Sequence, residues 1–184
     1  MTMFTPRVTA GFTRAASATA YAALDLVANS TTAADVAPLV FAKAARRAQS
    51  SGTISGASVV LEAASGSVAM PSALELLLFR AAPFADGAYP ADNAPLVGAS
   101  GALTEAALKN LVGRFQFTSF LQGGAAVAQA AGQPIDRAIT PFSLYGAGET
   151  ARDLYGLLYL PTGASWTPGN VAYDFSLALD VYQD

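Results

Sequence analysis

The sequence predicts an all-β protein, mainly antiparallel, with one short helix. Residues 171–183 give the strongest evidence, because large apolar side chains occupy the odd positions and mostly small or acidic ones the even positions. Successive side chains of a strand point to opposite faces, so this segment predicts a long strand with one buried face. One-sided burial is typical of antiparallel sheets. Turn residues divide the rest into short segments, which brings the total to about eight strands, as in a jelly-roll-like β-sandwich.

The chain of 184 residues predicts one domain preceded by an arm. Residues 1–18 are small and polar, with isolated phenylalanines and arginines. We expect them to form an extended N-terminal arm; a disordered tail is the alternative, because such segments order only when something holds them. Residues 19–184 are expected to form the β-sandwich domain.

Apolar segments that end in turn residues predict the strands of the first half. Residues 73–81 are apolar on nearly both faces, so a helix is the competing prediction for that run. A loop follows at 83–101, and loops of this length are usually functional or mobile. The expected strands of this half lie at residues 19–28, 38–47, 53–63 and 73–81.

The second half begins with a short helix at residues 103–111, for which Thr104 is the expected N-cap. A strand at 112–120 follows, whereas residues 122–133 have no clear periodicity. Residues 135–145 predict an edge strand, because Pro141 lies inside it. Residues 151–160 predict a strand that forms a hairpin with 171–183 across the loop that carries Trp166.

Composition indicates burial against other proteins. The chain is 53% hydrophobic and only 12% charged, where about 25% charged is ordinary. No apolar run reaches the ~18 residues of a membrane helix. A weakly charged surface suits burial against other subunits, although an alanine-rich composition would also explain it. A net charge of −3 argues against nucleic-acid binding.

The residue types needed for most catalytic sites are missing. The chain has no cysteine and no histidine, which excludes thiol chemistry, zinc sites built on these residues and Ser-His-Asp triads. Asp174 and Asp180 would lie roughly 20 Å apart on a strand, too far for an acid–base pair. Asp86, Asp92 and Asn93 offer oxygen ligands without the spacing of a calcium loop. We therefore expect no catalytic residue, no metal, no cofactor and no enzymatic activity.

Trp166 is the main candidate for a glycan-binding residue. It is the only tryptophan, and together with Tyr89 and Tyr159 it could stack on a sugar, as in carbohydrate-binding sandwiches. Packing inside the protein is the alternative. A carbohydrate-binding module therefore stays open as a second class of function.

Several segments, taken in order, carry a resemblance to a known family. They are YAALDLVA at 21–28, PLVF at 38–41, SSGTISGASVVLEA at 50–63, LELLLF at 74–79, ADNAPL at 91–96, VGRFQF at 112–117 and the whole of 153–184. From about Tyr21 to the C-terminus, this order resembles small virion proteins encoded beside the major capsid protein of tailed bacteriophages. The proteins of this family are described as capsid decoration, cement or head-stabilising proteins.

The resemblance implies a structural virion protein on the outer surface of an icosahedral head. It would be a homo-oligomer, usually a trimer, that clamps neighbouring major capsid subunits, with no nucleic-acid or membrane partner. The arm offers the residues that we expect to contact the capsid or a sister protomer: Phe4, Arg7, Phe12 and Arg14. A head–tail connector, a tail component or a fibre-base component is the alternative virion role.

Overall fold

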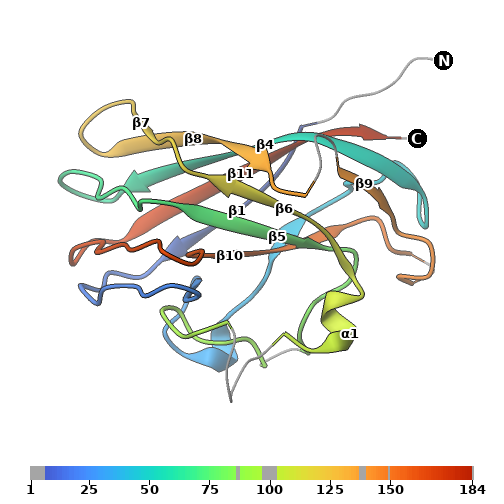
Figure 1. Cartoon of the computed structure of the whole chain (residues 1–184), viewed down its shortest axis with the longest axis horizontal. Coiled ribbons are helices and arrows are strands. Elements are labelled where there is room, and N and C mark those ends of the chain that lie inside the picture. The colour runs from blue at the N-terminus through green and yellow to red at the C-terminus, as the bar shows by residue number, and fades with distance from the viewer. Residues whose placement is uncertain (1–6, 86–87, 97–102, 137–139, 149, 184) are drawn as a thin grey trace.

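The computed structural model describes residues 7–85, 88–96, 103–136, 140–148 and 150–183 (Figure 1). Within these ranges the chain consists mainly of antiparallel strands, which confirms the expected all-β class. No helix in this part of the chain is long and apolar enough to cross a membrane.

In the described part of the chain, strands follow one another with a single short α-helix and one 3-10 helix between them. The elements are β1 (Arg7–Arg14), β2 (Leu26–Val27), η1 (Ala33–Asp35), β3 (Leu39–Phe41), β4 (Ser51–Ala63), β5 (Leu74–Phe79), α1 (Glu105–Leu108), β6 (Leu111–Phe117), β7 (Leu121–Gln122), β8 (Val127–Pro134), β9 (Thr140–Ser143), β10 (Leu154–Tyr159) and β11 (Tyr173–Gln183).

The sheet is continuous but curled into two layers. Its strand order is β1-β11-β4-β8-β6-β5-β10-β2. Strand β8 joins the layers, because most of it pairs with β4 while Gln133 and Pro134 pair with β6. Strand β1 comes close to β3, which pairs with β10 near the other end of this order. We call β1-β11-β4-β8 the β11 layer and β6-β5-β10 the β5 layer; the main apolar core lies between them.

Strand β11 shows the alternation that the sequence predicts. Tyr173, Phe175, Leu177, Leu179 and Val181 are buried, whereas three of the four side chains between them are exposed and only the small Ala178 is covered. The strand pairs along its length with β1 on one side and β4 on the other. It therefore lies inside the sheet and contributes one face to the core.

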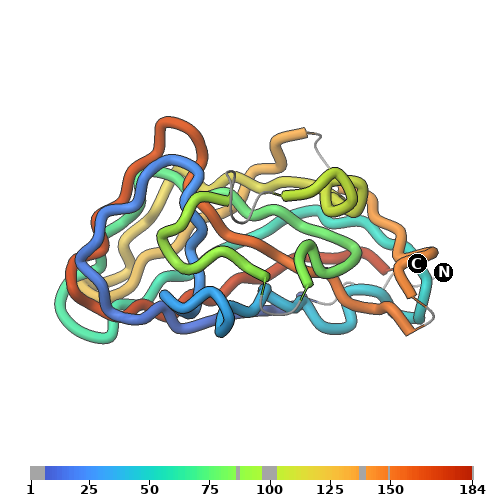
Figure 2. Tube along the Cα trace, turned by 90° about the horizontal axis from the view of Figure 1, so that it is seen from below, coloured from blue at the N-terminus to red at the C-terminus, as the bar shows by residue number. Residues whose placement is uncertain are grey.

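Strand β5 is buried at all six positions, Leu74–Phe79. Its inner face contributes to the main core, and its outer face supports a second apolar cluster with Tyr89 and Leu96 from the long loop and Val36. Burial on both faces explains why the run lacks alternation, and the structure confirms the strand rather than the helix. The loops and α1 cover the outer face of the β5 layer (Figure 2).

Helix α1 begins where the sequence predicts. The Thr104 hydroxyl oxygen accepts a hydrogen bond of 3.1 Å from the Ala107 N–H, which confirms the N-cap. The helix is shorter than expected because strand β6 already begins at Leu111. Residues 140–143 of the expected edge strand form β9, which pairs with β4; residues 137–139 lie outside the described residues.

Two local expectations were wrong. Strands β10 and β11 do not form a hairpin, because the Trp166 loop crosses from the β5 layer to the β11 layer. The expected strand at 19–28 is reduced to β2 and two isolated bridges, one between Tyr21 and Trp166 and one between Asp25 and Pro95. Leu24 has a φ of 73°, a left-handed conformation that ends regular pairing there.

Candidate functional site

Three of the four residues expected to contact other proteins lie on strand β1: Arg7, which faces outward, and Phe12 and Arg14, which face inward. Phe4 lies outside the described residues. Arg7 points outward, and its Nη2 donates a 2.6 Å hydrogen bond to the Ser58 hydroxyl of β4. The Phe12 ring points inward and stacks on Phe175 with centroids 5.0 Å apart. Residues 7–14 of the expected arm thus form a strand of the sheet in this chain.

Arg14 is completely buried, at 0% exposure. Its Nε lies 3.3 Å from a carboxylate oxygen of Asp92 and donates a hydrogen bond to the Tyr21 hydroxyl. Its other nitrogens donate to the carbonyls of Ser17 and Val171. Arg14 therefore donates its hydrogen bonds to groups of its own chain and exposes no surface to another subunit.

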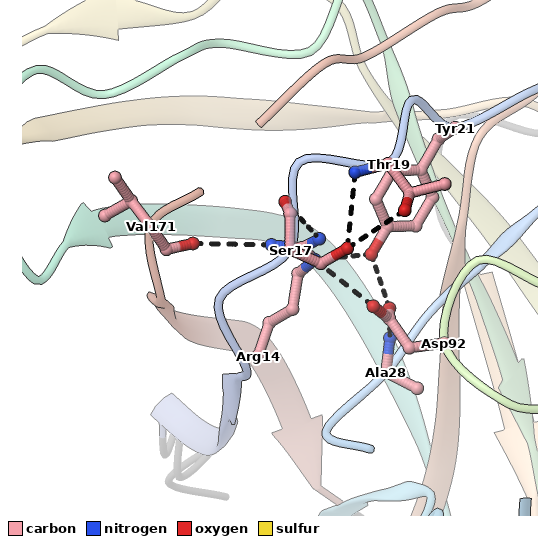
Figure 3. A network of polar contacts seen from close by, with 7 residues as sticks. All are labelled: Arg14, Ser17, Thr19, Tyr21, Ala28, Asp92 and Val171. Carbon is pink, nitrogen blue, oxygen red and sulfur yellow. Dashed lines mark hydrogen bonds and ion pairs between the residues drawn. The ribbon is translucent and has the colours of Figure 1, made fainter. Parts of the chain in front are cut away.

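Tyr21 and Asp92 complete this network, which Figure 3 shows as a chain of dashed contacts. The Tyr21 hydroxyl donates to Asp92, and the Ala28 N–H donates to the same carboxylate at 2.9 Å. Asp92 comes from the long loop, and Tyr21 follows β1 closely in sequence. The network thus fixes the end of β1 to a loop that covers the β5 layer.

Burial shapes the electrostatics of this network. It raises the pKa of Asp92 above its ordinary 3.8, an effect that the hydrogen bonds from Tyr21 and Ala28 and the charge of Arg14 oppose. Burial and the neighbouring Asp92 charge raise the pKa of Tyr21 above its ordinary 10.0. The phenol therefore stays neutral and keeps its donor for Asp92. With both charged side chains enclosed, the arrangement stabilises the fold and presents no reacting group to a substrate.

Trp166 is also enclosed, at 3% exposure. Its indole N–H donates a 2.7 Å hydrogen bond to the Ala69 carbonyl, and its ring contacts Tyr21, Tyr173 and Phe175. The Arg14 guanidinium lies 5.3 Å from the Trp166 ring centroid, a cation–π contact. No open ring face is left on which a sugar could stack.

A second charged group lies on the β5 layer. Arg114 of β6 lies 3.6 Å from the buried Glu75 carboxylate and 2.7 Å from Asp136. Burial, then the hydrogen bond to Glu75, raises the pKa of Tyr159 above its ordinary 10.0. Arg114, Asp136 and Tyr159 border an apolar hollow of about 370 Å³ whose other walls are leucines of β5, β6, α1 and the loops.

The outer face of the β11 layer, which we call the bare face, has no covering layer among the described residues. Its middle carries small uncharged side chains, and a shallow hollow of about 340 Å³ lies between Arg7, Leu121 and the strands beneath them. Leu121 is 66% exposed. The outward positions away from the ends are Thr9, Gly11, Ser58, Val60, Gln129, Ala131, Ser176 and Ala178.

Charged residues mark the two ends of the bare face. Arg7 and Asp180 lie 4.0 Å apart at one end, where both side chains are mainly exposed. Glu62 and Asp174 lie directly opposite each other at the other end. Among the described residues, no group of three or more Asp or Glu side chains is placed to hold a metal ion.

Sequence reasoning missed the buried network. One signal was available in the sequence. Arg14 occupies an even-numbered position of the strand, like Val8, Ala10 and Phe12, and these three side chains face the core. Asp92 was considered as an oxygen ligand for calcium and not as the partner of an arginine. Its partnership with Arg14 joins distant parts of the chain and leaves no local pattern.

Comparisons with known proteins do not establish a family. No family model matches the chain, and no curated protein matches it. Among solved structures, it is similar to the protein of "Crystal structure of 60-mer BFDV Capsid Protein", with 14% identity, a TM-score of 0.36 and coverage of 98% of this chain and 92% of the other.

Two further solved structures are similar at the same low level. A chain from the X-ray structure of melon necrotic spot virus is 12% identical, with a TM-score of 0.36 and coverage of 100% of this chain and 55% of that one. A chain of mud crab dicistrovirus is 9% identical, with a TM-score of 0.26 and coverage of 98% and 68%. TM-scores this low carry no argument about function.

Proposed function

We propose that this chain is a non-enzymatic structural protein of a virion, which decorates an icosahedral phage head by packing against neighbouring major capsid subunits. The bare face is the observation that carries the proposal. The β5 layer is covered on both sides by its own chain, whereas the β11 layer is covered only on its inner side. A sheet face left open in this way is available to another protein.

The side chains of the bare face suit close packing between proteins. Small residues such as Thr9, Ser176 and Ala178 lose little conformational entropy when a partner covers them. They also let the backbone of the partner approach closely. The middle of the bare face carries no charged side chain, and the cores of protein interfaces are likewise depleted of charge. Leu121 would supply an exposed apolar anchor beside them.

The sequence resemblance to head-decorating proteins supports the same role. Arg7 lies on the bare face and is proposed to contact a capsid subunit, together with Phe4, which lies outside the described residues. Phe12 and Arg14 would act indirectly, by fixing β1 to the sheet. Assembly as a homo-oligomer, and as a trimer in particular, belongs to this proposal.

The test is binding to heads assembled from the major capsid protein of the phage that encodes this chain under the proposal. Wild-type protein should co-sediment with the heads, and Ala131→Arg should weaken binding because a long charged side chain then stands on the bare face. Ala106→Arg on α1 is the matched control, since Ala106 is also exposed but belongs to the β5 side. Failure of the wild-type protein to bind would refute the proposal.

Copy number separates decoration from the alternative virion roles. A decorating protein should be present in hundreds of copies per particle, whereas a head–tail connector, tail or fibre-base component should be present in about a ring's worth. Quantitative mass spectrometry of purified particles gives this number. A ring-sized count would replace the decoration role with the connector or tail role.

A further inference from the structure

Unpaired basic side chains gather at one end of the long axis. Lys43, Arg46 and Arg47 lie in the turn after β3 and are all exposed. Within the described part of the chain, none of them takes part in an ion pair, although the whole sequence has only 10 basic residues. The Asp153 carboxylate lies at this turn but accepts its 2.8 Å hydrogen bond from the Lys43 backbone N–H, so the three basic side chains remain without an ion pair among the described residues.

The basic turn is held in place by its own backbone. The Gln183 amide donates to the carbonyls of Lys43 and Ala44 at 2.9 and 3.0 Å. The Arg152 guanidinium donates to the carbonyl of Arg46 at 2.9 Å. These contacts fix the turn beside the last residues of β11, at the end of the molecule where Figure 2 places the C-terminus. A fixed turn loses little entropy when it binds a partner.

Exposed tyrosines accompany the basic turn. Tyr145 is 74% exposed and follows Leu144, whose N–H bonds to the Ser50 carbonyl at the end of the turn region. Tyr182 is 38% exposed and pairs with Thr53 at the same end of β11. Arginine and tyrosine are the residue types that dominate binding energy at protein interfaces. We call Lys43, Arg46, Arg47, Tyr145 and Tyr182 the basic end.

The opposite end of the same layer is acidic. Asp174 and Glu62 are directly opposite each other in the β11–β4 register and both side chains are exposed. Like charges so placed destabilise a sheet. Thr13 donates a hydrogen bond to Asp174, but within the described part of the chain no cation pairs with either carboxylate. The length of β11 separates this acidic pair from the basic end by ~30 Å.

We propose that the basic end of one copy binds the acidic pair of a second copy, so that the chain associates head to tail. Each copy carries both halves of the contact, and among the described residues neither half forms an ion pair within its own chain. A contact between two different surfaces closes into a ring or continues as a filament, depending on the rotation between copies. This inference rests on the proposed function, because it names the self-contact of an assembling protein.

A charge exchange tests the contact. Arg46→Glu with Arg47→Glu places like charges against the acidic pair, and Glu62→Lys with Asp174→Lys does the same from the other side. Each double variant should weaken self-association roughly tenfold or more at low salt. The quadruple variant exchanges both signs and should recover association to within a few-fold of wild type. Sedimentation equilibrium of the full chain measures each dissociation constant.

Controls separate this contact from general charge effects and from misfolding. Glu105→Lys with Lys109→Glu exchanges an exposed ion pair of α1 and should leave association unchanged. Fluorescence of Trp166, the only tryptophan, reports whether each variant keeps its core. A wild-type chain that stays monomeric, double variants that associate like wild type, or a quadruple variant without recovery would each overturn the inference. Head binding by the wild-type chain is measured separately, so the proposed function can stand when this inference fails.

Discussion

The guanidinium of Arg14 and the carboxylate of Asp92 lie 3.3 Å apart, and almost none of either side chain reaches solvent. The pair joins the end of β1 to the loop that covers the β5 layer. Removing two charges from water is costly, so such a pair persists only when further hydrogen bonds satisfy it. Tyr21, Ser17 and Ala28 supply those bonds here.

Breaking this pair should strongly destabilise the fold. Arg14→Met leaves the Asp92 carboxylate buried without its cation and should lower the free energy of unfolding by about 3–5 kcal/mol. Urea denaturation followed by tryptophan fluorescence measures the change. Arg7→Ala is the control, because Arg7 and Asp180 form an exposed pair that should contribute less than about 1 kcal/mol. Equal losses in the two variants would contradict this reading of the network.

Stability should fall in alkaline solution. Burial raises the pKa of Tyr21 and Tyr159 above 10.0, so the native state keeps phenol protons that the unfolded state releases near that pH. Their contribution to the free energy of unfolding is fully present below pH 10 and is lost as the pH rises above it. Denaturation midpoints between pH 8 and about 11 check this. In Tyr21→Phe, stability should decline less steeply with rising pH. A slope equal to that of the wild type would contradict the prediction.

Trp166 should act through packing. Trp166→Ala removes a buried ring and its hydrogen bond to Ala69, and should lower the free energy of unfolding by about 3–5 kcal/mol. Tyr145→Ala removes an exposed aromatic and should change it by no more than about 0.5 kcal/mol. Calorimetric unfolding compares the two variants. Saturable glycan binding that Trp166→Phe abolishes without loss of stability would instead support the carbohydrate-binding alternative.

Gly113 and Thr140 pack so closely that a side chain at position 113 has no room. A Cβ on Gly113 would lie 2.4 Å from Cγ2 of Thr140, which is itself buried. Gly113→Ala should therefore lower the free energy of unfolding by about 1–3 kcal/mol. Thr140→Ser removes that methyl group, so the double variant should lose less than the sum of the single variants. Additive losses in a double-mutant cycle would show that strain arises elsewhere.

Period-2 patterns predicted the fold class because they are local and depend on burial alone. The alternation of β11 and the Thr104 cap are both set by residues close in sequence. The hairpin between β10 and β11 was wrong for the opposite reason. A loop cannot reveal whether it turns back within one layer or crosses to the other, since both need the same turn residues.

The candidate site was less predictable than the fold. Phe12 and Arg14 stood out as isolated large side chains on a small, polar segment, but they serve the core through partners at Phe175 and Asp92. The bare face and the basic end follow from which strands are neighbours and what covers them. That information depends on long-range pairing, which no local pattern in this chain contains.

The pairing of the first and last strands has a consequence for synthesis in the cell. The Thr13 hydroxyl donates a hydrogen bond to the carboxylate of Asp174, which lies 161 positions further along the chain. Strand β1 therefore leaves the ribosome long before β11 is synthesised, and until then its apolar face stays unpaired and exposed. Topologies dominated by such distant contacts fold slowly. The nascent chain would thus depend on chaperones, or on rapid completion, to avoid pairing β1 with the wrong molecule.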